Sequence, residues 1–442
     1  MQQLEAWTLI PFAIMLLVIA VAPLAIGRIW EKNVNKLIFV LALSIPTACY
    51  MAYIGLGEKI IDQIFYDYLP FIVLLGALFV VTGGIHIRYN MVATPLINTI
   101  VLFIGFNIAS FIGTTGAAML LIRPLLEINK CRQYKAHTIC FFIAMVANCG
   151  GVLSPLGDPP LFLLYLRGAE FDWFRSMFPE WAFVGGMLLI IYNIIDHIYY
   201  RRERRMLSAE GCAADSSDDD ELDEPLRLSV GGVVNIFYVV TIVTAVAFVN
   251  PTHIPAMGAE EAPLYMKFLR EIILLGIIFL SLWTTSKRVR HENNFSWEPI
   301  TEVAVLFIGI FTTMTPALIF LNTHAEALGL AEPWQFFYAT GALSSFLDNA
   351  PTAVAFHTVA TGLPVQEGAT LVAGVPQTML RAIALGSVFF GAMTYIGNGP
   401  NFMVKAIAEK EGVKMPSFFG YMFKFSLIVL LPIYVIMQLI FF

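Results

Sequence analysis

Two pairs of interrupted apolar stretches decide how this chain folds. In the first half, SFIGTTGAA (110–118) is followed by GVLSPLGDPP (151–160). In the second half, about 240 positions later, SFLDNAPTA (345–353) is followed by GAMTYIGNGP (391–400). Each motif places glycine, proline and small polar residues inside an apolar segment. Interrupted apolar segments at matching places in two halves indicate the binding site of a secondary transporter.

The composition predicts an all-α polytopic membrane protein. Of the 442 residues, 58% are hydrophobic and only 13% are charged, whereas charged residues make up about a quarter of a soluble domain. The mean hydropathy is +0.76. The net charge of −6 is concentrated in one loop, and without a basic stripe the sequence gives no sign of a nucleic-acid binder. The five cysteines lack metal-ligand or redox spacing.

Eight apolar runs are long enough to cross about 30 Å of hydrocarbon. They fall at 7–27, 36–56, 68–85, 178–199, 231–249, 267–285, 301–321 and 418–441. Four further segments are long but interrupted, at 92–127, 136–167, 333–361 and 377–408. Each half therefore contains three spans, two interrupted segments and a last span.

The distribution of Lys and Arg predicts the topology, because positive charge near span ends stays cytoplasmic. The basic clusters at 130–135 and 201–205 lie inside only if 92–127 enters and leaves on one side as a re-entrant hairpin. The second half reads in the same way, with a hairpin at 333–361.

Five crossings and one hairpin per half make the two halves inverted repeats, residues 1–199 and 230–442. The linker 200–229, with its acidic run Asp218 to Glu221, is then cytoplasmic and solvated. Both termini are expected outside, and the protein is expected in the cytoplasmic (inner) membrane.

The interruptions supply polar groups to an apolar bundle. Unwound backbone at membrane depth is tolerated only inside protein or beside a water-filled cavity, and each break frees carbonyl and N–H groups. The predicted hinges are Gly113, Gly116, Gly157, Pro159, Pro351, Gly397, Gly399 and Pro400. The predicted polar ligands are Thr114, Thr115, Ser154, Asn349, Thr352, Thr394 and Asn398. Such oxygens suit a dehydrated Na⁺, and helix N-termini suit an anion.

Two acids, Asp158 and Asp348, lie inside these motifs. An acid at membrane depth is a functional candidate, and a carboxylate that holds either a proton or Na⁺ produces exchange by competition. The alternative is helix capping, because Asp is a preferred N-cap residue and each acid lies just ahead of a proline. Capping alone does not explain an acid at depth in both halves.

At these motifs the chain resembles the ion transporter superfamily, which includes NhaD-type sodium/proton antiporters, arsenite permeases and citrate or dicarboxylate carriers. The most specific matches are GGVLSPLGD (150–158) and FLDNAPT (346–352), and the closest branch is labelled sodium:proton antiporter or citrate transporter. The resemblance implies a homodimer with elevator-like alternating access. It also implies a Na⁺ site at Asp158, Asp348 and Asn349, supported by Ser154 and Thr352, with no cofactor beyond Na⁺ and H⁺.

The first hairpin departs from the NhaD-type pattern. It carries Gly113-Thr114-Thr115 where those antiporters have Asp-Asn, and the Thr115–Ala118 stretch is closer to arsenite permeases. Neither hairpin has the intact Ser-Asn-Thr tip of the carboxylate carriers. The missing acid leaves the ion stoichiometry open and leaves room for an anionic substrate.

Four functions can be weighed against the sequence, and two of them fit it poorly. A cation/proton antiporter needs no organic substrate, whereas a Na⁺-coupled citrate or dicarboxylate carrier uses the acids only for the coupling ion. An intramembrane aspartyl protease would use Asp158 and Asp348 as its acid–base pair, but the first glycine of Gly-x-Gly-Asp is missing and Leu347 replaces the expected tyrosine. A passive channel has no need of two inverted pockets, so the inverted repeats favour a carrier over a channel. We therefore expect a transporter and not an enzyme.

Overall fold

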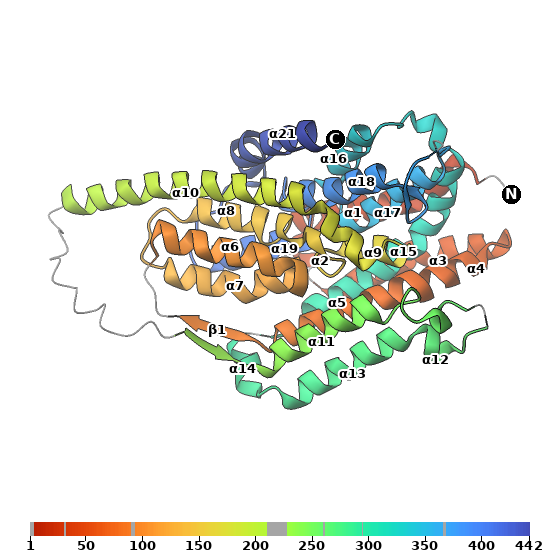
Figure 1. Cartoon of the computed structure of the whole chain (residues 1–442), viewed down its shortest axis with the longest axis horizontal. Helices are drawn as coiled ribbons and strands as arrows, with labels where there is room; N and C mark the ends of the chain where they lie inside the picture. Colours follow the sequence, from red (N-terminus) through yellow and green to blue (C-terminus); the bar gives the residue numbers. More distant parts are fainter. Residues whose placement is uncertain are drawn as a thin grey trace.

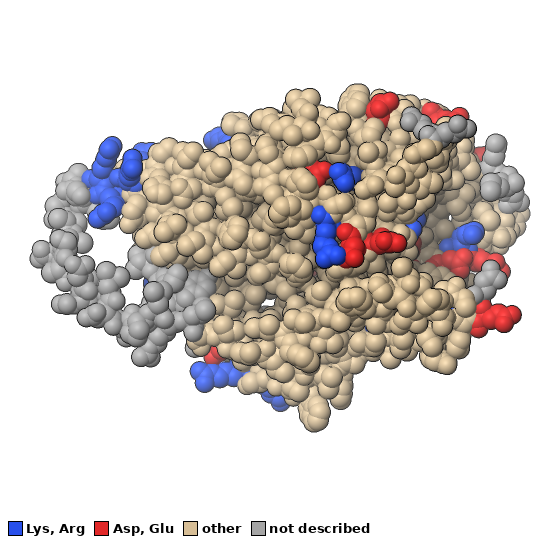
Figure 2. Space-filling view, in the orientation of Figure 1, with Lys and Arg blue, Asp and Glu red and all other residues tan. Residues whose placement is uncertain are grey.

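The computed structural model describes residues 4–30, 32–89, 93–209, 228–259, 261–293, 295–365 and 368–442. Within these residues, seven helices are long and apolar enough to cross a membrane. Charged side chains gather at the two ends of the long axis, and the face between them carries only a small mixed group of charges (Figure 2). The predicted all-α polytopic membrane fold is confirmed.

The elements of the first half alternate long helices with short ones. They are η1 (Ala6–Leu9), α1 (Ile10–Ala25), α2 (Gly27–Trp30), α3 (Asn33–Tyr53), α4 (Gly57–Asp62), η2 (Gln63–Tyr68), α5 (Leu69–Thr82), β1 (His86–Tyr89), α6 (Pro95–Ile112), α7 (Thr114–Ile128), α8 (Ala136–Met145), η3 (Cys149–Leu153), α9 (Pro159–Leu166), η4 (Phe171–Met177) and α10 (Phe178–Ala209).

The second half begins with a strand. Its elements are β2 (Leu228–Gly231), α11 (Val234–Phe248), η6 (Pro255–Met257), α12 (Leu264–Lys267), α13 (Leu269–Thr284), α14 (Lys287–Glu292), α15 (Glu298–Thr323), η7 (Ala325–Leu328), α16 (Pro333–Ser344), α17 (Asn349–Thr361), β3 (Leu371–Val372), β4 (Val375–Pro376), α18 (Gln377–Gly391), α19 (Gly399–Lys410), α20 (Phe418–Tyr421), η8 (Met422–Leu430) and α21 (Leu431–Phe441).

Two spans are longer than their apolar runs. The third begins at Gly57, because the polar residues before the run continue the helix through α4 and η2. Helix α10 runs to Ala209, so the first ten residues of the predicted linker are helical, as suits the strong helix propensity of Arg and Glu. Antiparallel pairing of β1 with β2 shows that the linker also ends earlier than predicted. The acidic run Asp218 to Glu221 lies outside the described residues.

All four interruptions are present as breaks between helices. Helix α6 ends at Ile112, and α7 starts at Thr114; Gly113 between them has a φ of +81°, which few L side chains adopt. Residues 345–348 separate α16 from α17, residues 154–158 precede α9, and residues 392–398 precede α19. Each break therefore lies where glycine, proline and small polar residues interrupt the apolar pattern.

The breaks are brought together by packing between the two halves. Helix α17 contacts α9, and α19 contacts α7, so each broken element of one half lies against one of the other. Helix α10 lies lengthwise over α6 and α8, whereas α5, α11 and α13 contact one another (Figure 1). The candidate site lies among the helices that bear the four breaks, α6 to α9 and α16 to α19.

Candidate functional site

The carboxylate of Asp158 lies where all four breaks meet. Its Oδ1 accepts hydrogen bonds from Thr114 Oγ1 at 2.6 Å and Asn398 Nδ2 at 3.2 Å. Its Oδ2 accepts from Asn349 Nδ2 at 2.8 Å. The three donors come from the first hairpin, the second broken helix and the second hairpin, and Asp158 is only 1% exposed. The structure thus joins four of the predicted site residues around one acid.

Asp158 is not used as a helix cap. It occupies the N-cap position of α9, but its side chain accepts no hydrogen bond from the backbone of that helix. All three of its donors are neutral, and within the described residues it forms no ion pair with Lys, Arg or His. A buried carboxylate with only neutral donors lacks full compensation for its charge, so a proton or a cation is its natural complement.

Ser154 and Thr394 brace the two turns in the same way. Ser154 Oγ donates to the carbonyl of Ser110, and Thr394 Oγ1 donates to the carbonyl of Ser345. Each hydroxyl also accepts from a backbone N–H two residues later, at 3.1 Å and 3.2 Å respectively. The predicted ligands Ser154 and Thr394 therefore join each broken helix to the hairpin beside it.

Two predicted hinge glycines are needed for close backbone approach. A Cβ on Gly157 would overlap the carbonyl oxygen of Gly151, and a Cβ on Gly397 would lie 2.6 Å from that of Gly391. The carbonyl of Gly157 also accepts from Thr114 N at 2.7 Å. This tight turn places Asp158 against the tip of the first hairpin.

The remaining predicted hinges lie at helix starts or in helix contacts. Pro159, Gly399 and Pro400 occupy the first turns of α9 and α19, and Pro351 lies in the first turn of α17. A Cβ on Gly116 would touch Thr82 of α5, so this glycine serves helix packing.

Asp348 has the capping geometry that Asp158 lacks. Its carboxylate accepts from Ala350 N at 3.1 Å at the start of α17, and Thr352 Oγ1 donates to the Asp348 carbonyl at 2.9 Å. No hydrogen bond joins the side chains of Asp348 and Thr352 to Asp158 in the described residues. Of the predicted Na⁺ ligands, the structure brings together Asp158 and Asn349.

Thr115 lies beside a small cavity at the tip of α7. The cavity, of about 80 Å³, is lined by Thr114, Thr115 and Gly116 and by apolar residues of α5 and α15. The first N–H groups of a helix are unpaired and favour negative charge. The hairpin tip therefore offers hydroxyls and a helix N-terminus next to Asp158.

A second layer of amides, formed by Asn148 and Asn401, lies beside this centre. Asn148 donates to Asn401 Oδ1 at 2.7 Å and accepts from Asn398 Nδ2 at 3.1 Å, and Asn401 donates to the carbonyls of Gly391 and Thr394. Both Asn148 and Asn401 are fully buried. Their position inside apolar segments was the available signal, since a polar group at membrane depth is costly unless it is paired.

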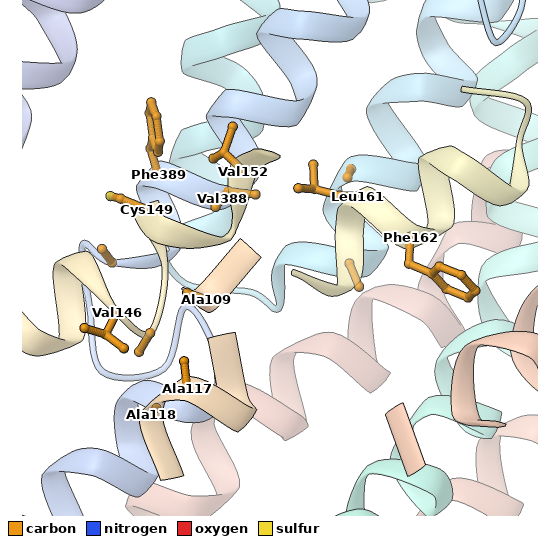
Figure 3. Close-up of a cluster of buried hydrophobic side chains, with 14 of the residues drawn as sticks. Ala109, Ala117, Ala118, Val146, Cys149, Val152, Leu161, Phe162, Val388 and Phe389 are labelled. Atoms are coloured by element: carbon orange, nitrogen blue, oxygen red, sulfur yellow. The ribbon is translucent and has the colours of Figure 1, made fainter. Parts of the chain in front are cut away.

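Apolar side chains surround the polar centre. Ala109 of α6, Ala117 of α7 and Leu161 of α9 lie in one buried cluster with Val152 and Val388 (Figure 3). Low-dielectric walls strengthen the electrostatic interactions inside. Within the described residues, no group of three or more His, Cys, Asp or Glu side chains could hold a metal ion.

A larger hollow lies beyond the far end of α9. Its volume is about 860 Å³, and its walls come from the end of α9 and the residues after it (168–172), from the end of α11 and the loop that follows (250–259), and from the start of α13. Arg270, buried on this wall, pairs with Glu271 and stacks over the rings of Phe162 and Tyr165. The hollow is lined by the end of α9 on one side and by α11 and the start of α13 on the other.

Sequence comparison agrees with this geometry. Residues 1–442 match the family described as "Putative citrate transport". The chain belongs to this family. Two relatives are named "Uncharacterized transporter Mb2703", from Mycobacterium bovis, and "Uncharacterized transporter Rv2684", from Mycobacterium tuberculosis. Each is 24% identical over 334 residues, which cover 72% of this chain and 71% of the relative. Family and relatives support a membrane transporter rather than an enzyme.

Proposed function

We propose that this citrate transport family member is a secondary active transporter that exchanges Na⁺ for H⁺ at Asp158. The observation that carries the proposal is the buried Asp158 carboxylate, with three neutral donors and no cationic partner among the described residues. Such a group is stable when it holds a proton or a monovalent cation. Because it can hold only one of them at a time, binding of one releases the other.

Alternating access would carry this site across the membrane. All four breaks contribute to the site at Asp158, so the helices that bear them would move together. Helices α11 and α13 would then keep their position in the membrane. The cytoplasmic membrane location, a cytoplasmic linker between α10 and β2, the two outside termini and the homodimer belong to the same proposal. Inverted repeats with broken helices suit such a cycle.

A Na⁺-coupled carboxylate carrier is the second candidate. It is favoured by the cavity at Thr114, Thr115 and Gly116, where the N-terminus of α7 suits an anionic group. The family description names citrate transport. In this case Asp158 would bind the coupling ion and the hairpin tip would receive the substrate carboxylate.

Liposomes loaded with a pH-sensitive dye and free of organic anions separate the two. We expect Na⁺ addition to drive proton efflux, with Li⁺ and K⁺ as cation controls, and Asp158→Asn to abolish it. Absence of a response to every cation, together with Na⁺-dependent uptake of labelled citrate, would reject antiport in favour of the carboxylate carrier.

A further inference from the structure

The hydroxyl of Ser344 lies between two acceptors. Its Oγ is 2.6 Å from Asn349 Oδ1 and 2.6 Å from the carbonyl oxygen of Ser387. A hydroxyl has one hydrogen, so it cannot make both bonds fully at once. Ser344 is completely buried, and no other group of the described residues bonds to its oxygen. One of the two contacts must therefore dominate in each state of the site.

The amide of Asn349 is free to turn, unlike its neighbours. Asn398 and Asn148 each donate to a backbone carbonyl, that of Ala147 and that of Ile143, which fixes the direction of their amide groups. Within the described residues, the side-chain amide of Asn349 forms hydrogen bonds only with the side chains of Asp158 and Ser344. Which end of such an amide faces which partner follows from the hydrogen-bond network.

Two complete networks are possible at these three side chains. When Asp158 is ionised and empty, Asn349 Nδ2 donates to it and Ser344 donates to Asn349 Oδ1. When Asp158 holds a proton or Na⁺, the amide oxygen must face it, because a protonated carboxyl donates and a hard cation prefers oxygen. Asn349 Nδ2 then donates to Ser344 Oγ, and the Ser344 hydrogen goes to the Ser387 carbonyl.

We infer that Ser344 is a positioning residue that senses the occupancy of Asp158 through reversal of the Asn349 amide. When Asp158 holds a proton or Na⁺, the hydrogen bond from Ser344 to the Ser387 carbonyl links α16 to α18. When Asp158 is ionised and holds neither, that hydrogen bond is lost. Gly391 permits the reversal, because a Cβ there would overlap both the oxygen and the nitrogen of the Asn349 side chain. The inference rests on the proposed exchange at Asp158.

Ser344 contributes one hydrogen bond to the empty network and two to the occupied one. Removing it therefore weakens the binding of both Na⁺ and H⁺ by one net bond, which is about fivefold in affinity. Ser344→Ala should raise the Na⁺ KM about fivefold at alkaline pH, where protons do not compete for Asp158. Because the proton is also held less tightly, the pH of half-maximal exchange should move to a lower value. A simple packing defect would lower kcat without shifting both ligands together.

Ser345→Ala is the matched control, because the Ser345 hydroxyl, in the part of the chain that the structure describes, bonds only to the carbonyl of Gly341. Both variants are measured in liposomes for Na⁺-driven proton efflux across pH, and in detergent for stabilisation by Na⁺. An unchanged Na⁺ KM and pH profile in Ser344→Ala would overturn the inference. If that variant does not fold, Ser344→Cys gives the same comparison, since a thiol is a weak donor and acceptor.

The two failures are distinguishable. If the unmodified protein shows no Na⁺-driven proton efflux, the proposed function fails and the inference fails with it. If the unmodified protein exchanges the ions and Ser344→Ala behaves like Ser345→Ala, the inference alone fails.

Discussion

The side-chain nitrogen of Asn398 lies 3.2 Å from Oδ1 of Asp158, although the residues are 240 positions apart. Each follows a turn in which a hydroxyl, Ser154 or Thr394, bonds to the neighbouring hairpin. The two residues therefore occupy matching places in the two halves, one as an acid and the other as its neutral amide. Of these two matching positions, only the one at Asp158 therefore carries a titratable group.

Asn398 should strengthen ion exchange by holding the ionised form of Asp158 in place. Asn398→Ala removes one of three donors to a buried carboxylate, and hydrogen bonds to charged groups contribute about 1.5–3 kcal/mol. We expect the apparent Na⁺ affinity, measured from proton efflux in liposomes, to fall by about tenfold or more. Asn107→Ala is the control, because among the described residues the Asn107 side chain bonds only to the Phe103 carbonyl of its own helix. Equal behaviour of the two variants would argue against a role of Asn398 at the site.

Asp348 is expected to matter for stability more than for ion binding. Its carboxylate caps α17, and loss of a cap costs about 1 kcal/mol, whereas Asn caps as well as Asp. Asp348→Asn should therefore retain both thermal stability in detergent and Na⁺-driven proton efflux, and Asp348→Ala should lose stability. If Asp348→Asn abolishes efflux as Asp158→Asn does, the carboxylate of Asp348 belongs to the ion site after all.

The sequence predicted the fold class and the places of the breaks, because lipid imposes long apolar runs and makes Gly113 or Gly157 conspicuous within them. It also predicted that Asp158, Asn349 and Asn398 would meet. It could not assign different roles to Asp158 and Asp348, because both precede a proline and only the tertiary structure shows which carboxylate faces its own helix.

Long-range polar contacts were the part that local patterns could not reveal. Asn148 and Asn401 interact across 253 positions, and no periodicity indicates such a pairing. Asp196 falls at the end of an apolar run, yet α10 continues past it and the loop after α7 covers it. Burial by a loop depends on chain path rather than on residue pattern.

The turn at Gly157 should tolerate no side chain. Gly157→Ala would force the Cβ into the Gly151 carbonyl, and overpacking of a buried site costs about 1–3 kcal/mol or more. We expect lower thermal stability in detergent and strongly reduced transport. Gly399→Ala is the matched control, since nothing lies within 4 Å of an added Cβ there. Retained stability and transport in Gly157→Ala would show that the turn can open.

A buried charge cluster of Arg132, Asp196 and Glu203 should stabilise the loop that joins the first hairpin to the first broken helix. Arg132, in the loop between α7 and α8, donates to Asp196 Oδ1 at 2.7 Å and to Glu203 Oε2 at 2.5 Å, both on α10. Asp196 is fully buried and also accepts from Asn98 of α6. The cluster therefore joins two helices, α6 and α10, to the loop between α7 and α8.

Removal of Arg132 leaves Asp196 and Glu203 buried without their shared cation, which costs about 3–5 kcal/mol. Arg132→Gln should therefore lower the unfolding temperature in detergent by several degrees. Lys130→Gln is the control, because Lys130 pairs with Glu127 at the surface, where both side chains are about two-thirds exposed (68% and 67%), and such pairs contribute about 0–1 kcal/mol. Equal unfolding temperatures for the two variants would mean that the cluster does not stabilise the hairpin, and transport by Arg132→Gln would then be expected to match that of the unmodified protein.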